Sequence, residues 1–458
     1  MLREKLYERR RWRGVIHTTW NPDGPGVIRL HMIPPRFHWF RTVPSLVIIN
    51  GQDIVPLNEG WAILLTELIE GINKHGDAPI SQEQMEEILQ EVFREVRKVY
   101  GKVSDDLLRE DLRTIVDAFE AIARGRKPDI DIGILSLADY APEMTAPHRM
   151  DLMISAMTKE GSWHCNQRCL HCYAAGQEYA EVPELTTDQW KTIIAKCREA
   201  RIPQLTFTGG EPTLREDLCE LIYEARWFVT RLNTNGVLLT EELCRSLRKA
   251  ELDSVQVTLY SHKAEIHDRL VGADNFEQTV QGIRSALAAG LNLSVNTPLC
   301  SLNRDYAGML AFLHELGVQY VTCSGLIVTG GARTAASQET QLAPEEIYEA
   351  VRAATEFAYS HEMEISFTSP GWIESERLTA LGLTVPSCGA CLSNMAVTPD
   401  GHVIPCQSWL SEQPLGSILT DTWPAIWDSA ACRTIREQSV REQGVCPLRA
   451  ADREGGEA

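Results

Sequence analysis

Apolar and polar positions follow two different patterns along the chain, and the change comes near Asp151. Beyond it, short apolar runs typical of buried strands alternate with stretches in which apolar residues recur every three to four positions, as in helices. Repeated strand–helix units predict a parallel sheet, either doubly wound or a full or partial barrel. The expected strands are Leu152–Met157, Leu205–Thr208, Arg231–Asn235, Val255–Leu259, Leu293–Thr297 and Tyr320–Cys323. The expected helices are Thr187–Ala200, Leu214–Trp227, Glu241–Lys249, Phe276–Ala289 and Arg304–Leu316.

The section before Asp151 predicts a small separate module. Two short β-like runs, Leu46–Ile49 and Ile54–Leu57, are joined by Asn50-Gly51, a strong hairpin signal. A hairpin followed by three helices predicts a winged-helix-like module over residues 1–125, and a proline-containing linker over residues 126–150. The three expected helices are Glu59–Asn73, Ser81–Tyr100 and Ser104–Ala123, and the second has Gln84 at the capping-box position after Ser81.

Composition narrows the class of protein. The chain has 458 residues, which favours two to four domains, and a formal charge of −19, which disfavours broad binding to nucleic-acid phosphates. It contains no apolar run of about 18 residues, and its basic N-terminus lacks the apolar segment of a secretory signal. Thirteen cysteines without such a signal predict a cytoplasmic protein whose cysteines are thiols, metal ligands or catalytic groups.

The first chemical signal is a cluster of cysteines after the first expected strand. Cys165, Cys169 and Cys172 form the spacing C-x3-C-x2-C. Three thiolates on one loop can bind three irons of a cubane cluster and leave the fourth iron without a protein ligand. The alternatives are three buried thiols or a zinc loop, although zinc would need a fourth ligand nearby.

A glycine-rich turn follows the second expected strand. Gly209-Gly210-Glu211-Pro212 allows the backbone to approach a ligand closely, although the motif alone is a common strand-to-turn sequence. Together with the cysteine loop one strand–helix unit upstream, it makes residues 151–331 resemble the core of the radical S-adenosylmethionine (SAM) superfamily. The resemblance implies an α/β fold with a partial (β/α)6 barrel over residues 151–340 and an enzyme that starts carbon-radical chemistry.

The resemblance also implies the cofactors and their contacts. A [4Fe–4S] cluster on Cys165, Cys169 and Cys172 would bind SAM at its open iron and cleave it reductively to a 5′-deoxyadenosyl radical, which abstracts hydrogen from the substrate. The expected SAM contacts are Gly209, Gly210 and Glu211 at the methionine end, Tyr173 at the adenine, and Asn235, Thr258 and Asn296 at later strand ends. Each of these last three residues could equally be a strand-end polar residue or a turn former.

A second cysteine group lies near the C-terminal end. Cys388, Cys391 and Cys406 have the spacing C-x2-C-x14-C, and a hairpin centred on Asp400-Gly401 would bring Cys406 back toward Cys391. The pattern resembles the auxiliary-cluster extension of the SPASM/twitch branch of radical SAM enzymes. The alternative is a structural zinc site.

This second resemblance implies one auxiliary [4Fe–4S] cluster of the twitch type, because the chain has too few later cysteines for the two clusters of a full SPASM tail. Cys446 is the expected fourth ligand and Cys432 a reserve candidate in what looks like an ordinary helix; otherwise one iron is open. The implied domains are residues 341–385, a helix and strand completing the barrel, and residues 386–458, the cluster domain.

The N-terminal module resembles the peptide-binding chaperone of PQQ biosynthesis and related recognition elements of ribosomally made, modified peptides. The resemblance rests on the run Val47–Glu59 and its three helices, and it implies that a leader peptide is added as a strand to the hairpin edge, against the third helix. The alternative is a docking or dimer surface. The implied partners are a ribosomal precursor peptide and a reductant such as flavodoxin or ferredoxin, with no nucleic acid or membrane.

The implied reaction is an intramolecular thioether, carbon–carbon or carbon–oxygen crosslink in that peptide. One competing interpretation is a radical enzyme of cofactor biosynthesis that acts on a small molecule or a tetrapyrrole. The other is a non-enzymatic iron–sulfur electron carrier or sensor, which the glycine-rich turn disfavours.

Overall fold

The computed structural model describes residues 16–20, 28–37, 42–51, 53–75, 80–124, 126–411, 413–442 and 444–448. The chain divides into two compact units, Met1–His148 and Arg149–Ala458. Residues 1–15 of the expected module and residues 449–458 of the expected cluster domain lie outside the described residues. In the described part, no helix is long and apolar enough to cross a membrane.

The first unit is built on a four-stranded antiparallel sheet in the order β1-β2-β5-β6. The predicted hairpin is β5–β6, and its turn residues Asn50 and Gly51 have positive φ angles of 50° and 72°, which these two residue types tolerate. The two preceding strands were not predicted. The strands are β1 (Ile16–Trp20), β2 (Ile28–Ile33), β5 (Leu46–Ile49) and β6 (Asp53–Pro56), with a separate two-stranded ladder of β3 (Arg36–Phe37) and β4 (Thr42–Val43).

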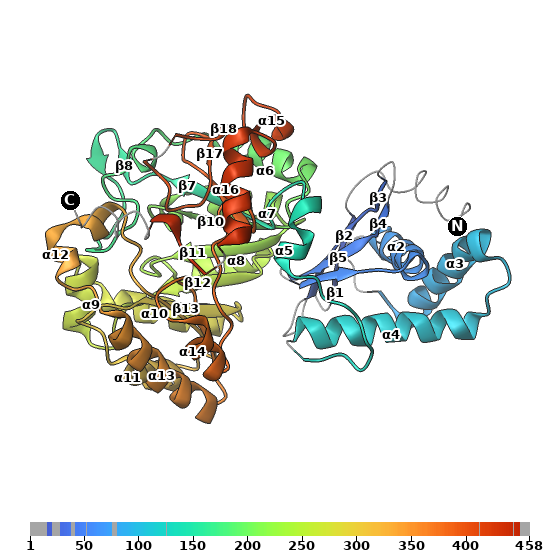
Figure 1. Ribbon diagram of the computed structural model, residues 1–458, viewed down its shortest axis with the longest axis horizontal. Coiled ribbons are helices and arrows are strands. Elements are labelled where there is room, and N and C mark those ends of the chain that lie inside the picture. Colours follow the sequence, from blue (N-terminus) through green and yellow to red (C-terminus); the bar gives the residue numbers. More distant parts are fainter. Residues whose placement is uncertain are drawn as a thin grey trace. The chain divides into compact units, whose positions relative to one another are not determined.

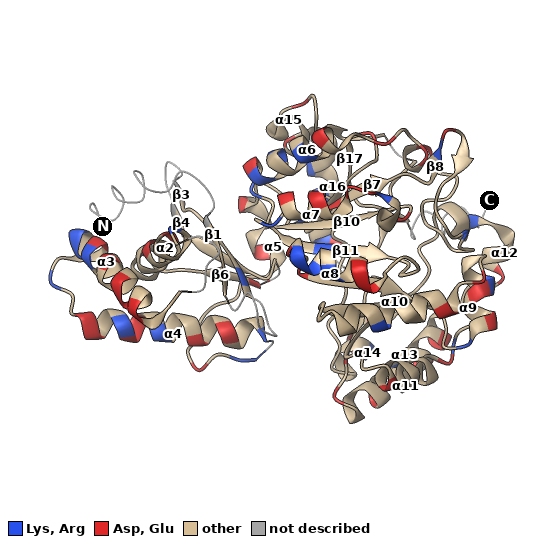
Figure 2. Ribbon diagram, turned by 180° about the vertical axis from the view of Figure 1, so that it is seen from behind, with Lys and Arg blue, Asp and Glu red and all other residues tan. Residues whose placement is uncertain are grey.

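Three helices pack on this sheet, as predicted (Figure 1). Each begins after a side chain that accepts a hydrogen bond from its first turn: Asn58, Ser81 and Ser104. Apolar residues of the helices and the sheet form one core, while α3 and α4 carry interspersed acidic and basic residues (Figure 2). The helices are α2 (Glu59–Asn73), α3 (Gln82–Tyr100) and α4 (Asp105–Ala123).

The second unit contains a ten-stranded sheet in the order β15-β14-β13-β12-β11-β10-β7-β16-β17-β18. The strands from β15 to β16 are parallel, and β17 and β18 continue the sheet in antiparallel pairing. The strands are β7 (Arg149–Ser155), β10 (Gln204–Gly209), β11 (Val229–Thr234), β12 (Ser254–Thr258), β13 (Leu293–Pro298), β14 (Tyr320–Ser324), β15 (Glu364–Phe367), β16 (Asn394–Val397), β17 (His402–Ile404) and β18 (Gly416–Ser417).

All six predicted strands are present, in a mixed α/β fold with a parallel sheet. The first begins three residues earlier than predicted, because Arg149 already pairs with both β10 and β16. The helix predicted from Leu214 begins only at Leu218, since Pro212–Leu214 forms a 3-10 turn. The covering helices are α6 (Thr187–Glu199), α7 (Leu218–Glu224), α8 (Glu241–Lys249), α9 (Ala264–Val271), α10 (Phe276–Ala288), α11 (Tyr306–Glu315) and α13 (Pro344–Ser360).

The parallel strands have one apolar and one polar face. In β11, β12 and β13, fully buried residues alternate with half-buried ones, as expected when successive side chains point to opposite faces. Valines, leucines and threonines lie on the fully buried face, and the half-buried residues lie on the opposite face. Most of the half-buried residues are polar, apart from Val229 and Pro298: Arg231, Asn233, Ser254, Gln256, Thr258, Ser294 and Asn296.

Candidate active site

The three motif cysteines lie on one loop, which follows the short strand β9 (Ser162–Trp163). All three are free thiols of intermediate exposure. Cys165 donates a hydrogen bond to the carbonyl oxygen of Gly210 at 3.4 Å, and Cys169 donates one to the side-chain oxygen of Gln167 at 3.5 Å. The structure therefore brings the cysteine loop into contact with the glycine-rich turn.

The loop is held by backbone hydrogen bonds from segments distant in sequence. The amides of Arg168 and Leu170 donate to the carbonyls of Val271 and Leu270 at the end of α9, at 2.9 and 2.8 Å. The carbonyl of Cys172 accepts a hydrogen bond of 2.8 Å from the amide of Gly331. A loop fixed in this way presents its thiols with little freedom to move apart.

Burial favours the neutral form of these three thiols. Burial raises the pKa of Cys165 to about 12, and burial also raises the pKa values of Cys169 and Cys172. Thiolates at this site therefore need nearby positive charge, which bound iron provides. The three free thiols on one anchored loop fit an iron–sulfur cluster, although no group of three or more His, Cys, Asp or Glu side chains in the described residues already converges as ligands of a metal ion.

The two glycines of the turn are required by close packing against β7. Gly209 has a φ of 133°, and a Cβ there would overlap the carbonyl oxygen of Ser155. A Cβ on Gly210 would lie 2.7 Å from the carbonyl oxygen of Ala156. The absence of side chains at Gly209 and Gly210 thus allows the turn to pack closely against the neighbouring strand. The carbonyl of Gly210 points toward Cys165.

Glu211 is only 1% exposed, and its carboxylate bonds to protein groups. It accepts from the amide of Thr213 at 3.0 Å, the amide of Asn235 at 2.8 Å, and the hydroxyls of Thr213 and Thr234 at 2.5 and 2.6 Å. Burial nevertheless raises its pKa. Glu211 therefore positions the turns after β10 and β11 relative to each other.

Asn235 completes a connection back to the cysteine loop. Its side-chain amide donates to the side-chain oxygen of Asn166 at 2.6 Å, and Asn166 directly follows Cys165. Sequence analysis did not single out Asn166, because an Asn inside a metal-binding loop has no distinctive spacing. The path Asn166–Asn235–Glu211 links three segments that lie far apart in sequence.

Tyr173, Thr258 and Asn296 have different surroundings. Tyr173 packs in an apolar cluster that also contains Cys165 and Cys172, and burial raises the pKa of its hydroxyl. Thr258 and Asn296 are neighbours in register on β12 and β13, farther around the sheet. Thr322 donates to the Asn296 side-chain oxygen at 2.8 Å and was missed in the sequence. Polar residues alternating within buried parallel strands are the signal that could have found it.

The second cysteine group gathers around the β16–β17 hairpin. As predicted, the hairpin returns the chain to its start, since the amide of Cys391 donates to the carbonyl of Pro405 at 3.1 Å, next to Cys406. Cys391 has a positive φ of 54° and is fully buried. Burial raises the pKa of Cys406 to about 12, and the charges of Cys388 and Cys446 add to this rise, so these thiols lie close enough to interact.

Cys432, the reserve candidate for the fourth ligand, also lies beside this group. It lies in helix α16 (Ala430–Arg441), as predicted, but its thiol is hydrogen-bonded to that of Cys391, which lowers the pKa of Cys432. Arg436 donates to its sulfur at 3.5 Å. The hydroxyl of Ser439 donates to the carbonyl of Ala390 at 2.8 Å and holds the helix against the cysteine turn.

Known families match both cysteine groups. Residues 164–313 match the radical SAM superfamily, and residues 388–448 match the SPASM iron–sulfur cluster-binding domain. The chain is 28% identical over 317 residues to a PqqA peptide cyclase of Streptomyces rochei, covering 65% of this chain and 85% of that protein. It is 38% identical over 125 residues to a probable GTP 3′,8-cyclase of Thermococcus kodakarensis, covering 27% of this chain and only 40% of the cyclase.

Among solved structures, SuiB of Streptococcus suis shares the fold, with a TM-score of 0.56 and 15% identity, over 86% of this chain and 87% of SuiB. Residues 149–458 are about 68% of the chain, so this likeness includes part of the first unit. SuiB has also been solved with SAM and with its precursor peptide SuiA. These matches place a radical SAM domain on the first cysteine group and a SPASM iron–sulfur cluster-binding domain on the second.

Proposed function

We propose that this enzyme cleaves SAM at a [4Fe–4S] cluster held by Cys165, Cys169 and Cys172 and crosslinks a ribosomally made peptide. The observation that carries the proposal is the contact between the cysteine loop and the strand-end turns, through Cys165–Gly210 and Asn166–Asn235. The bound cluster and SAM supply electron transfer into the sulfonium and a radical that abstracts hydrogen. The protein's own residues hold the thiols, orient the turns and exclude water.

The proposed SAM site follows the turns that Glu211 positions. The backbone of Gly209 and Gly210 would meet the methionine end, and Tyr173 the adenine. Asn235 in the turn after β11, and Thr258 and Asn296 on the polar face of the sheet, stay proposed contacts. Because the carboxylate of Glu211 accepts its hydrogen bonds from protein groups, Glu211 acts on SAM indirectly, by positioning Asn235 and the turn.

We propose one auxiliary cluster bound by Cys388, Cys391 and Cys406, with Cys446 as its fourth ligand. When bound there, such a cluster would supply an acceptor for the electron that a substrate radical must lose to form a closed-shell crosslink. Cys432 is the rival fourth ligand, because its thiol contacts that of Cys391. Iron and sulfide quantitation on Cys446→Ala and Cys432→Ala separates the two: loss of about four irons only in the Cys446 variant supports the proposal, and loss only in the Cys432 variant reverses it.

Two findings support a peptide substrate. The related PqqA peptide cyclase matches 65% of this chain, and the likeness to SuiB extends into the first unit. The first unit also has the expected elements of a leader-binding module, a hairpin with an edge strand and a third helix beside it. A cytoplasmic flavodoxin or ferredoxin is the proposed reductant, and thirteen free cysteines suit that reducing compartment.

The test is mass spectrometry of a peptide encoded beside this gene after anaerobic incubation with SAM and reductant. We expect 5′-deoxyadenosine and a peptide product that has lost two hydrogens per crosslink. The Cys165/Cys169/Cys172→Ala variant should form neither, whereas Cys197→Ala, a buried thiol on α6, should retain both. Release of 5′-deoxyadenosine with an unchanged peptide mass would contradict a crosslinking function.

A second candidate, radical chemistry on a small molecule, is favoured by the likeness to the probable GTP 3′,8-cyclase. That likeness covers less than half of the cyclase. Turnover of a nucleotide or tetrapyrrole in the absence of any peptide would favour this candidate over the peptide crosslinker.

A further inference from the structure

A short segment of the chain lies along the free edge of the first unit's sheet. Residues 130–135, with the sequence Ile-Asp-Ile-Gly-Ile-Leu, follow α4 and lie beside β6, the last strand of the sheet. The amide of Leu135 donates to the carbonyl of Ile54 at 2.9 Å, and the two residues form an antiparallel bridge. Ile130 and Ile132 pack against the core, whereas Asp131 and Gly133 are exposed. Residues 130–133 thus alternate like a strand, although the segment forms only one bridge and the alternation ends at the exposed Ile134.

The edge of β6 offers few backbone groups to any added strand. Val55 pairs with Val47 of β5, and the amide of Leu57 donates to Ser45, so alternate residues of β6 face inward. Ile54 and Pro56 therefore face outward. Because proline has no N–H, Ile54 is the only one of these two that can both donate and accept. The carbonyl of Ile54 already accepts the hydrogen bond from the amide of Leu135.

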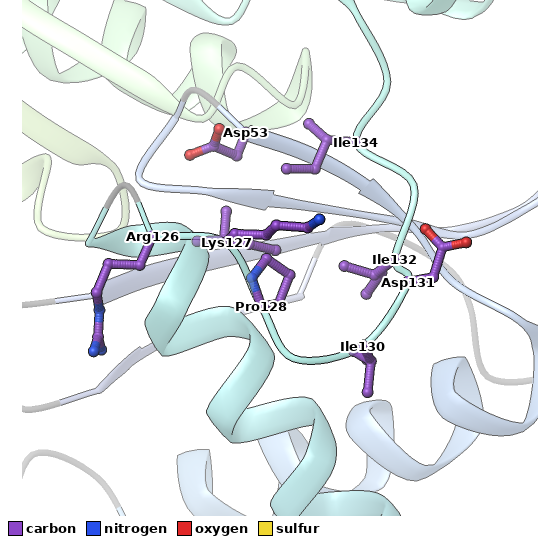
Figure 3. A pocket seen from close by; sticks show the side chains of 9 residues that line it. Asp53, Arg126, Lys127, Pro128, Ile130, Asp131, Ile132 and Ile134 are labelled. Carbon is purple, nitrogen blue, oxygen red and sulfur yellow. The ribbon is translucent and has the colours of Figure 1, made fainter.

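Beside this contact the edge is hollowed. An open groove of about 440 Å³ is lined by Asp53 of β6, Ile122 of α4 and the chain from Arg126 to Ile134 (Figure 3). Figure 3 shows Asp53 and Ile134 on the side of the sheet edge, with Pro128, Ile130 and Ile132 along the arc of the segment. Ile134 remains 50% exposed. The segment occupies the edge without filling the space next to it.

We propose that residues 130–135 are a resident occupant of the peptide-binding edge, and that its partner is an extended peptide with aliphatic residues at alternate positions. Such a peptide takes over the Ile54 carbonyl and the places of Ile130 and Ile132. The inference rests on the proposed function, because the partner is the substrate's leader peptide. Two extended segments cannot lie along the same stretch of the β6 edge or fill the sites of Ile130 and Ile132 at once, so the leader binds by displacing the segment.

This exchange also sets the affinity. The leader replaces the backbone hydrogen bond and the aliphatic contacts of the segment with equivalent ones of its own. Any additional binding free energy must therefore come from contacts in the unfilled groove beside Ile134. A substitution that weakens the binding of residues 130–135 to the β6 edge increases the fraction of molecules in which the edge is open. The apparent affinity for the peptide rises in proportion to that fraction.

The test uses the full chain and a labelled synthetic peptide that copies residues 127–136, followed by fluorescence anisotropy. Leu135→Pro removes the N–H donor, while Leu135→Ala keeps it. Ile132→Asn disrupts a packed side chain, and Ile134→Asn, at an exposed site, is its control. We expect Leu135→Pro and Ile132→Asn each to bind the probe at least tenfold more tightly than wild type, and both controls to stay within twofold.

Equal binding by wild type and all four variants, or no binding by any of them, would overturn the proposal. Hydrogen exchange gives a second measurement on the same proteins: the peptide containing Leu135 should lose protection when probe is added to wild type at high concentration, and unchanged protection with probe bound would also overturn it. Neither measurement needs SAM or iron. Probe binding without peptide crosslinking therefore leaves this inference standing while the proposed function fails, and crosslinking without probe binding does the reverse.

Discussion

Replacement of Glu211 by Gln is the sharpest test of how the site is held together. The carboxylate accepts hydrogen bonds from two backbone amides, Thr213 on one oxygen and Asn235 on the other. A glutamine side chain has one oxygen and one NH2 group, so either orientation leaves one of these amides facing another donor. The hydroxyls of Thr213 and Thr234 can rotate to adapt, but the backbone amides cannot.

The expected cost in free energy is that of one buried backbone N–H group left without a hydrogen-bond acceptor. Such a group costs about 2–3 kcal/mol, which corresponds to about a 30- to 150-fold change in an equilibrium constant. The cost falls on the turn that carries Asn235, whose side chain reaches Asn166 in the cysteine loop. We therefore expect SAM to bind about 30- to 150-fold more weakly to the reconstituted Glu211→Gln enzyme, with the loop cysteines still able to hold iron.

The assay is equilibrium binding of SAM to anaerobically reconstituted protein, with hydrogen exchange of the peptide that contains Asn235. Glu216→Gln, at an exposed position five residues along the chain, is the matched control and should leave both unchanged. A SAM affinity within threefold of wild type, together with unaltered exchange at Asn235, would refute the positioning role of Glu211.

Three further predictions concern stability. Burial, with smaller effects from nearby acidic residues, raises the pKa of Glu67 from 4.5 to about 7. The folded protein thus holds a proton on Glu67 that the unfolded chain has lost, and its stability falls as pH rises from 5 to 8. In thermal melts, Glu67→Gln should therefore be more stable than wild type by about 1–3 kcal/mol at pH 8 and by almost nothing at pH 5. Parallel pH profiles of the two proteins would contradict this. In Gly282→Ala the new Cβ would overlap the carbonyl oxygen of Gly236, so the second unit should lose about 1–3 kcal/mol in denaturant unfolding, and an unchanged midpoint would exclude that packing. Ser81→Ala removes the capping box with Gln84 and should cost about 1 kcal/mol in the urea unfolding of the first unit, against no change if the helix start is held by other contacts.

Local signals predicted most helices and parallel strands. Helices α2 and α8 begin and end at the residues that their apolar periodicity predicted. Strands β1 and β2 were missed, because alternation is a poor guide where both faces are covered: in β2, Arg29 and His31 are buried together with their apolar neighbours. Their pairing depends on β5, well downstream, and no short window of sequence contains both partners.

The same division applies to the site. The spacing of Cys165, Cys169 and Cys172 on one loop is a local property, and it alone predicted three thiols at one place. The use of Glu211 as a support instead of a ligand-facing group could not be predicted, since its partners come from the next strand. Cys432 was only a reserve candidate because its sequence is that of an ordinary helix, and the packing of α16 brings it to Cys391.

By itself the sequence determined the spacing of the cysteines, the order of strands and helices, and the helix caps, because these depend on neighbours within a few residues. Tertiary structure decided which thiols share a site, why the paired glycines are needed against β7, and that residues 130–135 lie on the β6 edge. These outcomes depend on contacts between residues far apart in the chain, whose free energy includes loop closure and packing that no local pattern records.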